Sequence, residues 1–174
     1  MSITKLAEIT VGAGGAASID FTSIPGTYTD LLVVHSIRST QAIVSAYATL
    51  TITPTSSTYS MRGLYGTGSS VGSFTTPVNY IGELTGANAT ASTFGNGQIY
   101  FPNYAGSTYK SYSTDSVGES NGSAANQSLT AGLWSTTSAI TGISIVSTSG
   151  TFVQYSTATL YGITKGSSGG VTVS

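Results

Sequence analysis

Apolar and polar residues alternate along much of this chain, whereas no segment keeps the three- to four-residue spacing of an amphipathic helix. The alternation is clearest in residues 42–52, where one face holds only apolar side chains: Val44, Ala46, Ala48, Leu50 and Ile52. Residues 30–39 start with an apolar run, Leu31 to Val34, that puts apolar side chains on both faces. The first pattern is typical of a strand with one buried face, and the second of a strand buried on both sides.

Only Thr40 and Gln41 separate these two segments, so we expect them to pair as a β-hairpin. Similar patterns predict strands at residues 4–11, 18–21, 59–64, 78–84, 98–101, 107–113, 128–134, 139–147 and 152–164. In the last of these, Val153, Tyr155, Tyr161 and Ile163 should share one face. Glycine-rich turns are expected at 12–15 and around Pro25-Gly26, and exposed loops at 66–72 and 118–126.

Eight or so strands, no helix and a length suited to one domain predict an all-β fold, an antiparallel β-sandwich of jelly-roll type over residues 1–165. No repeat with a fixed period appears, which argues against a β-helix or a propeller. Residues 166–170 are Gly and Ser with no apolar side chain, so we expect 166–174 to be a flexible tail. Its last four residues are either free or an added edge strand.

The composition supports the β prediction and narrows the function. The 29 Ser, 29 Thr and 22 Gly make 80 of 174 residues, and these residue types are indifferent or poor helix formers. Charged residues are only 6% of the chain, about a fourfold depletion relative to typical soluble domains. The net charge of −1 provides no basic surface for nucleic acid and no polybasic membrane patch, so we expect neither partner.

The scarcity of charged residues also suggests that the protein assembles with other subunits. Residues 120–164 contain no charged side chain, and the cores of protein interfaces are similarly poor in charge and rich in aromatic residues.

The chain has no Cys, which removes disulfides, thiolate metal sites and cysteine catalysis. Glu8 places a charge where a signal peptide would have its apolar segment, so we do not expect a signal peptide. The longest apolar run, 31–34, is far below the roughly 20 residues that a membrane helix needs.

Candidate catalytic residues do not form a recognisable set. The single histidine, His35, lies within an apolar strand pattern, and we expect it to be structural. The motif Gly-x-Ser-x-Gly occurs around Ser70, Ser120 and Ser168, but no predicted helix follows any of them and His35 precedes all three. Asp115 and Glu119 are the one close carboxylate pair, in a predicted loop. We therefore assign no catalytic, cofactor-binding or metal-binding residue, expect no cofactor, and expect no enzyme.

Tyrosines are the remaining candidates. Seven of them crowd the loop-rich middle of the chain: Tyr59, Tyr65, Tyr80, Tyr100, Tyr104, Tyr109 and Tyr112. Tyrosine among Gly, Ser and Asn is typical of adaptable binding surfaces, because the ring gives a large contact area at low entropic cost. The alternative is that such rings cap the core with the hydroxyl reaching water. Both interpretations remain open for this chain.

Two stretches resemble a known family. Residues 19–34 read IDFTSIPGTYTDLLVV, with the pattern F-x-x-I-P-x-x-Y-x-D-L before an apolar strand. The end of the chain has Trp134, then AITGI at 139–143, GTF at 150–152 and LYGI at 160–163. Together these resemble small jelly-roll virion proteins of tailed bacteriophages, over about half the chain. The motifs are structural, so they indicate the fold more strongly than the role.

The resemblance implies a capsid decoration (cement) protein or a tail-fibre or other receptor-binding part. The domain begins almost at the first residue without a fibre shaft, so we favour a self-contained decoration protein on the capsid exterior, made in the bacterial host cytoplasm. Its expected partners are the major capsid protein and copies of itself, in a homotrimer or alternatively a dimer. Met1–Lys5 and residues 166–174 are the expected contact elements. The alternatives are a receptor-binding tip, with a host-surface glycan as ligand, and a non-viral lectin-like module.

Overall fold

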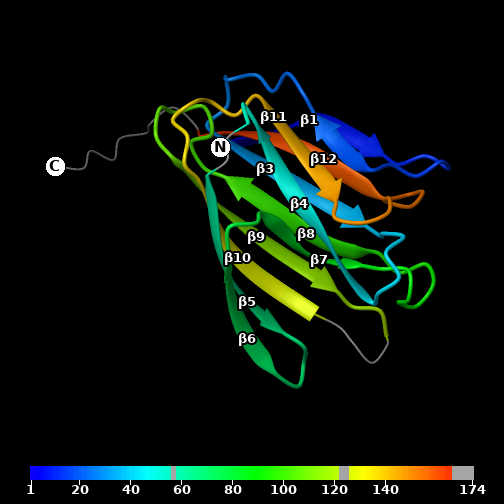
Figure 1. Cartoon of the computed structure of the whole chain (residues 1–174). Helices are drawn as coiled ribbons and strands as arrows, with labels where there is room; N and C mark the ends of the chain where they lie inside the picture. Colours follow the sequence, from blue (N-terminus) through cyan, green and yellow to red (C-terminus); the bar gives the residue numbers. More distant parts are fainter. Residues whose placement is uncertain (56–57, 122–125, 166–174) are drawn as a thin grey trace.

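Two antiparallel β-sheets pack face to face in this chain (Figure 1), as seen in a computed structural model that describes residues 1–55, 58–121 and 126–165. The large sheet has eight strands in the order β1 (Ser2–Thr10), β12 (Thr157–Thr164), β3 (Asp30–Ile37), β8 (Gly95–Phe101), β9 (Lys110–Gly118), β10 (Asn126–Trp134), β5 (Tyr59–Gly66) and β6 (Val71–Thr76). The small sheet has four in the order β2 (Ser18–Phe21), β11 (Gly142–Ser147), β4 (Ser45–Thr53) and β7 (Tyr80–Thr85). The described part of the chain contains no helix.

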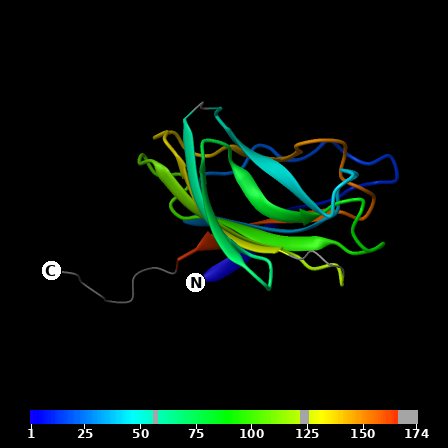
Figure 2. The ribbon, with the colours of Figure 1, turned by 60° about the horizontal axis from the view of Figure 1, so that its bottom comes forward.

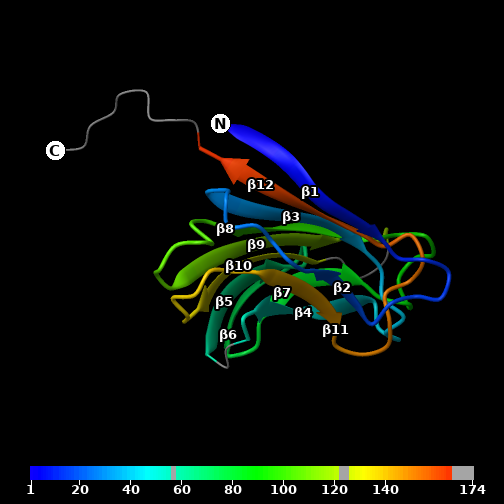
Figure 3. The ribbon, with the colours of Figure 1, turned by 90° about the horizontal axis from the view of Figure 1, so that it is seen from above.

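The core lies between the two sheets. The small sheet covers only one face of the large sheet, which is visible in two further orientations (Figures 2 and 3). Leu31, Val33 and Ile37 of β3 and Leu50 and Ile52 of β4 belong to one continuous apolar cluster. Burial of these side chains between the layers is the main source of stability, at about 25 cal/mol per Å² of apolar surface. The chain is thus an all-β sandwich with a single core, as the alternating pattern predicted.

Several sequence predictions are confirmed in detail. The strand predicted at 18–21 is β2, and β4 buries the expected alternate side chains, Ala46, Ala48, Leu50 and Ile52. The glycine turn at 12–15 is closed by a hydrogen bond from the Gly15 N–H to the Gly12 carbonyl. Gly15 has a φ of 71°, a conformation that glycine adopts without a steric penalty.

The predicted hairpin between residues 30–39 and 42–52 is wrong. β3 pairs with β12 and β8 in the large sheet, whereas β4 pairs with β11 and β7 in the small sheet. Each strand must turn its apolar face toward the same core, so the intervening residues cross from one layer to the other. Arg38 stabilises this crossing, because its guanidinium donates hydrogen bonds to the carbonyls of Ala87, Ala89, Thr90 and Thr93.

The strand count and several boundaries also differ from the predictions. The described residues form twelve strands rather than eight or so. The loop expected at 66–72 is shorter, because β6 already begins at Val71. The last strand begins at Thr157, so Val153 and Tyr155 do not lie on it, and its inward residues are Ala158, Leu160 and Gly162. Residues 166–174, the predicted tail, lie outside the described residues.

One further difference concerns β3, which is buried on one face only. Leu31, Val33, His35 and Ile37 point into the core, whereas Leu32 is only partly buried and Val34 is 41% exposed. The second apolar face of this strand therefore lies on the side of the large sheet that the small sheet does not cover. We call this side the outer face.

Candidate interaction surface

His35 is enclosed in the core and far from solvent. It is 2% exposed, and neither ring nitrogen has a hydrogen-bond partner. Burial lowers the pKa of His35 to about 4, so the ring is neutral at pH 7. It lies opposite Gly97 of β8, where the absence of a side chain leaves room for the imidazole. The structure thus places His35 as a packed core residue.

The serine motifs do not meet His35 or a helix in the described chain. Ser70 lies in the turn of the β5–β6 hairpin, where its hydroxyl and that of Thr67 are 2.9 Å apart. Ser120 follows β9, is 2% exposed, and its hydroxyl has no hydrogen-bond partner. Ser168 lies outside the described residues. The nucleophile geometry that this motif signifies, a sharp strand-to-helix turn, is absent at the two described serines.

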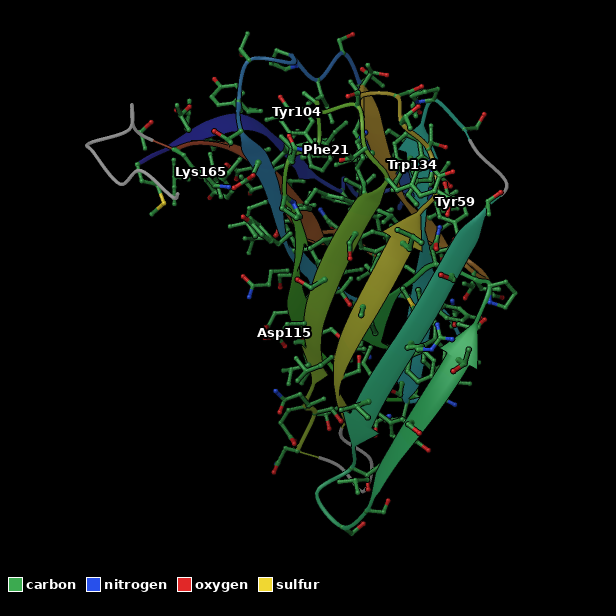
Figure 4. All side chains as sticks on the ribbon, turned by 90° about the vertical axis from the view of Figure 1, so that its left-hand side faces the viewer. Phe21, Tyr59, Tyr104, Asp115, Trp134 and Lys165 are labelled. Atoms are coloured by element: carbon green, nitrogen blue, oxygen red, sulfur yellow. The ribbon has the colours of Figure 1, made fainter. Side chains whose placement is uncertain are left out.

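The predicted carboxylate pair separates into two environments. Asp115 lies on β9 and points to the outer face, in the middle of the large sheet (Figure 4). Glu119 is in the following loop and accepts a hydrogen bond from the backbone N–H of Asn121. Neither belongs to a group of three or more potential metal ligands within the described ranges.

Three buried charges were not anticipated from the sequence: Asp30, Glu83 and Lys110. Glu83 of β7 is 6% exposed; the Ser45 hydroxyl donates to its carboxylate, and the Asn126 amide in turn donates to Ser45. Burial raises the pKa of Glu83, partly offset by these hydrogen bonds. A carboxylate inside the apolar 78–84 pattern was the only sequence signal for this position.

Lys110 is buried as well, at 1% exposed. Its ammonium donates to the carbonyls of Gly106, Thr108 and Thr137, and lies 5.8 Å from the centre of the Trp134 ring. Burial lowers the pKa of Lys110. These contacts tie the loop before β9 to the end of β10, so the lysine serves the fold and is not accessible to a ligand.

The tyrosines divide between core and surface. Tyr104 and Tyr112 are buried, and Tyr59 is half-buried with its hydroxyl accepting the Ile52 N–H. Tyr104, Tyr59 and Trp134 gather toward one end of the sandwich (Figure 4). Tyr65 and Tyr109 are exposed at 38% and 59%. Tyr104 and Tyr112 therefore belong to the core, whereas a binding role for the exposed Tyr65 and Tyr109 stays a prediction.

The outer face of the large sheet is the face that the small sheet leaves uncovered (Figures 2 and 3). Register places Tyr161, Leu32 and Tyr100 side by side across β12, β3 and β8. Val34 is the next residue of β3 after Leu32 that points to the outer face, and Ile3, 55% exposed, lies at the start of β1. These five side chains form an apolar and aromatic patch, which we call the β3 patch.

A shallow groove lies on the same face at the far side of the sheet. It has a volume of about 940 Å³, and its apolar lining comes from Leu64, Val71, Val117 and Leu129. Leu64 is 62% exposed and Leu129 52%, although they are cross-strand neighbours on β5 and β10. Large exposed apolar side chains that adjoin one another are a common sign of an interaction site.

The two edges of the large sheet differ. On β1, the register shifts between Lys5 and Ala7, and Lys5 forms an exposed ion pair with Glu8 at 2.8 Å. Bulges and edge charges are devices by which natural sheets discourage unwanted strand pairing. β6 has neither: residues 71–76 contain no charge and no proline, and the pairing with β5 is regular.

Comparison with protein-family models, with curated proteins and with solved structures found no match to this chain. Within the described residues, no helix has the length and hydropathy to cross a membrane.

Proposed function

We propose that the sandwich is a jelly roll with two inserted hairpins. Eight strands remain when β5–β6 and β9–β10 are set aside, and they pair in nested order: β1 with β12, β2 with β11, β3 with β8, and β4 with β7. A jelly roll arises from winding such a nested antiparallel ribbon into two sheets of four strands. The inserted hairpins add four strands to one side of the large sheet.

On this scaffold we propose a non-enzymatic virion structural protein, a capsid decoration (cement) protein that binds the outer face of the capsid lattice. The observation that carries the proposal is the β3 patch. Leu32 and Val34 have the sequence pattern of a strand buried on both sides, yet in the isolated chain Leu32 is only partly buried and Val34 is 41% exposed. A major capsid protein in the lattice is the partner that covers this face.

The positions of the start of β1 and the end of β12 support this arrangement. Ser2 pairs with Thr164, so the start of β1 and the end of β12 lie together beside the β3 patch. Met1, 88% exposed, extends the apolar surface beyond Ile3 there. Binding only to the assembled shell stabilises that shell by mass action, which is the physical role of a cement protein.

The second candidate is a receptor-binding tip of a tail or head fibre. The groove favours it, because Glu119, Asn126 and Gln127 adjoin its apolar lining and offer the polar groups that bind a host-surface glycan. We place it second because only one aromatic side chain, Tyr65, lines the groove.

The deciding experiment measures binding of the purified protein to capsids that lack it. We expect saturation near one copy per major capsid protein, or one third of that for a trimer on each three-fold site. Val34→Lys should weaken binding by tenfold or more, because a charge would enter the β3 patch. Tyr155→Lys is the matched control, since Tyr155 is 69% exposed outside this patch.

Saturation at a few copies per hundred capsid subunits, with soluble protein blocking adsorption to cells, would instead support the receptor-binding tip. Binding to a glycan array without any affinity for capsids would indicate a lectin-like module.

A further inference from the structure

β6 is the last strand of the large sheet, and its outer edge has no strand partner among the described residues. The Thr67 N–H bonds to the Ser70 carbonyl and closes the β5–β6 hairpin. Antiparallel ladders alternate hydrogen-bonded and non-bonded residue pairs. Counted from that closing bond, Val71, Ser73 and Thr75 direct their backbone N–H and C=O groups away from β5. All three residues are exposed, Val71 at 90%.

Nothing on this edge opposes pairing with an identical strand. A two-fold axis brings each residue against its own kind, so like charges on the edge would repel. Residues 63–82 contain no charged side chain. The opposite edge of the sheet, β1, has the bulge and the Lys5–Glu8 ion pair and is poorly suited to the same contact.

We propose that two copies of this chain pair antiparallel through β6, forming a two-fold dimer with one continuous sheet. The central register sets Ser73 against Ser73 of the second copy and Val71 against Thr75. Each of these three residues then gains a backbone donor and an acceptor across the seam. This inference does not depend on the proposed capsid role, because it concerns the free protein.

The side chains beside the seam suit this register. On the outer face, Leu129, Leu64 and Ser73 follow one another across β10, β5 and β6. The dimer continues this row through the second Ser73 to a second Leu64 and Leu129. The two apolar grooves therefore meet at the axis, and the exposed Val71 of each copy is covered by Thr75 and the stem of Arg62 from the other. The second shallow groove, lined by Arg62, Leu64, Thr75 and Leu129, lies at this junction.

The contact favours a dimer over a trimer. An edge that pairs with its own copy through a two-fold axis is no longer free for a third subunit, so the assembly closes at two subunits. Pairing of β6 with β1 of another copy would be head-to-tail and would give rings or filaments instead.

The test is the mass of the free protein by sedimentation over a wide concentration range. We expect the wild-type chain to approach twice its 17.6 kDa mass as concentration rises. Ser73→Lys should remain monomeric at concentrations at least tenfold above the wild-type midpoint, because two ammonium groups would face each other at the axis. Thr10→Lys, an exposed position on β1, is the matched control and should dimerise like the wild type.

A second experiment, with complementary charges at position 73, tests the register. Ser73→Asp alone should also be monomeric, whereas an equimolar mixture with Ser73→Lys should recover the dimer. Circular dichroism of each variant shows whether the fold is retained. A wild-type chain that stays monomeric at every concentration, a trimer or larger ring, or a Ser73→Lys protein that still dimerises would each overturn the proposal.

Discussion

Buried ionisable side chains give this charge-poor protein two opposite responses to pH. His35 is neutral in the core, with both ring nitrogens unpartnered, because burial disfavours the imidazolium. Glu83 is also buried, and its raised pKa favours the protonated carboxyl. A group with a lowered basic pKa loses its stabilising contribution as pH falls, whereas one with a raised acidic pKa loses it as pH rises. His35 therefore stabilises the fold more at higher pH, and Glu83 stabilises it more at lower pH.

The His35 contribution is measurable by substitution. Its pKa falls from 6.5 in the unfolded chain to about 4 in the folded one, so the stability that it contributes is complete above pH 6.5 and disappears as pH falls toward 4. The expected loss is about 3 kcal/mol, at 1.36 kcal/mol per pKa unit. In His35→Leu this contribution to the pH dependence of the free energy of unfolding should vanish. Urea unfolding of both proteins at pH 7 and pH 4.5 isolates the effect, because Glu83 is common to both; parallel slopes would contradict it.

Glycines paired with aromatic rings shape the strands that the two hairpins add. Gly63 lies opposite Phe74, Gly72 opposite Tyr65, and Gly132 opposite Tyr112. In each pair the ring occupies the space where a glycine Cβ would be. A ring lying over a cross-strand glycine restores the apolar contact that glycine lacks and holds the strand register. These glycines are therefore sheet residues and not flexible points.

Gly132→Ala tests this role. The added Cβ would lie 2.1 Å from the Tyr112 Cζ, and Tyr112 is buried and cannot move aside without disturbing the core. We expect a loss of about 2 kcal/mol in the free energy of unfolding, as for overpacked cores. Gly14→Ala, with no atom within 4 Å of the new Cβ, should stay within about 0.5 kcal/mol. Urea midpoints measure both, and equal values for the two variants would refute the role.

At the scale of elements, the sequence predicted strands well where alternation was strong, as in β2 and β4. It predicted pairing poorly, because partners are chosen by the shared core and not by nearness in the chain. β6 was missed because Gly72 and Ser73 give it a loop-like composition, and only contact with Tyr65 and Leu64 on β5 shows it to be a strand. The β3 patch was visible as an apolar run, but which face lacked cover required the structure.

For the molecule as a whole, strands from opposite ends of the chain are neighbours. β1 pairs with β12 and β2 with β11, and the start of β1 lies beside the end of β12, where Ser2 is opposite Thr164 (Figure 3). Most of the sheet pairing is thus between segments far apart in sequence, which slows folding because long loops must close before contacts form. The order of the chain and the order of the sheet are largely independent.

A circular permutant tests this organisation. Ser174 is joined to Met1, and the chain is opened between Gly14 and Gly15, in an exposed turn. All strand pairs are retained, and β12 and β1 become neighbours in sequence. We expect the melting temperature to stay within several degrees of the wild type and the refolding rate to increase, because contact order falls. Stopped-flow refolding with Trp134 fluorescence measures the rate; an unfolded permutant would contradict the arrangement.

The place of β12 in the large sheet has a consequence during synthesis. β12, the last strand of the described residues, lies between β1 and β3, which are among the first strands to be made. A growing polypeptide on the ribosome therefore has no neighbour for β1, and one side of β3 stays open until residues 157–164 emerge. Unfinished chains with unpaired strand edges are prone to associate wrongly. The large sheet can therefore be completed only after residues 157–164 have been made, and until then the nascent chain exposes unpaired edges of β1 and β3.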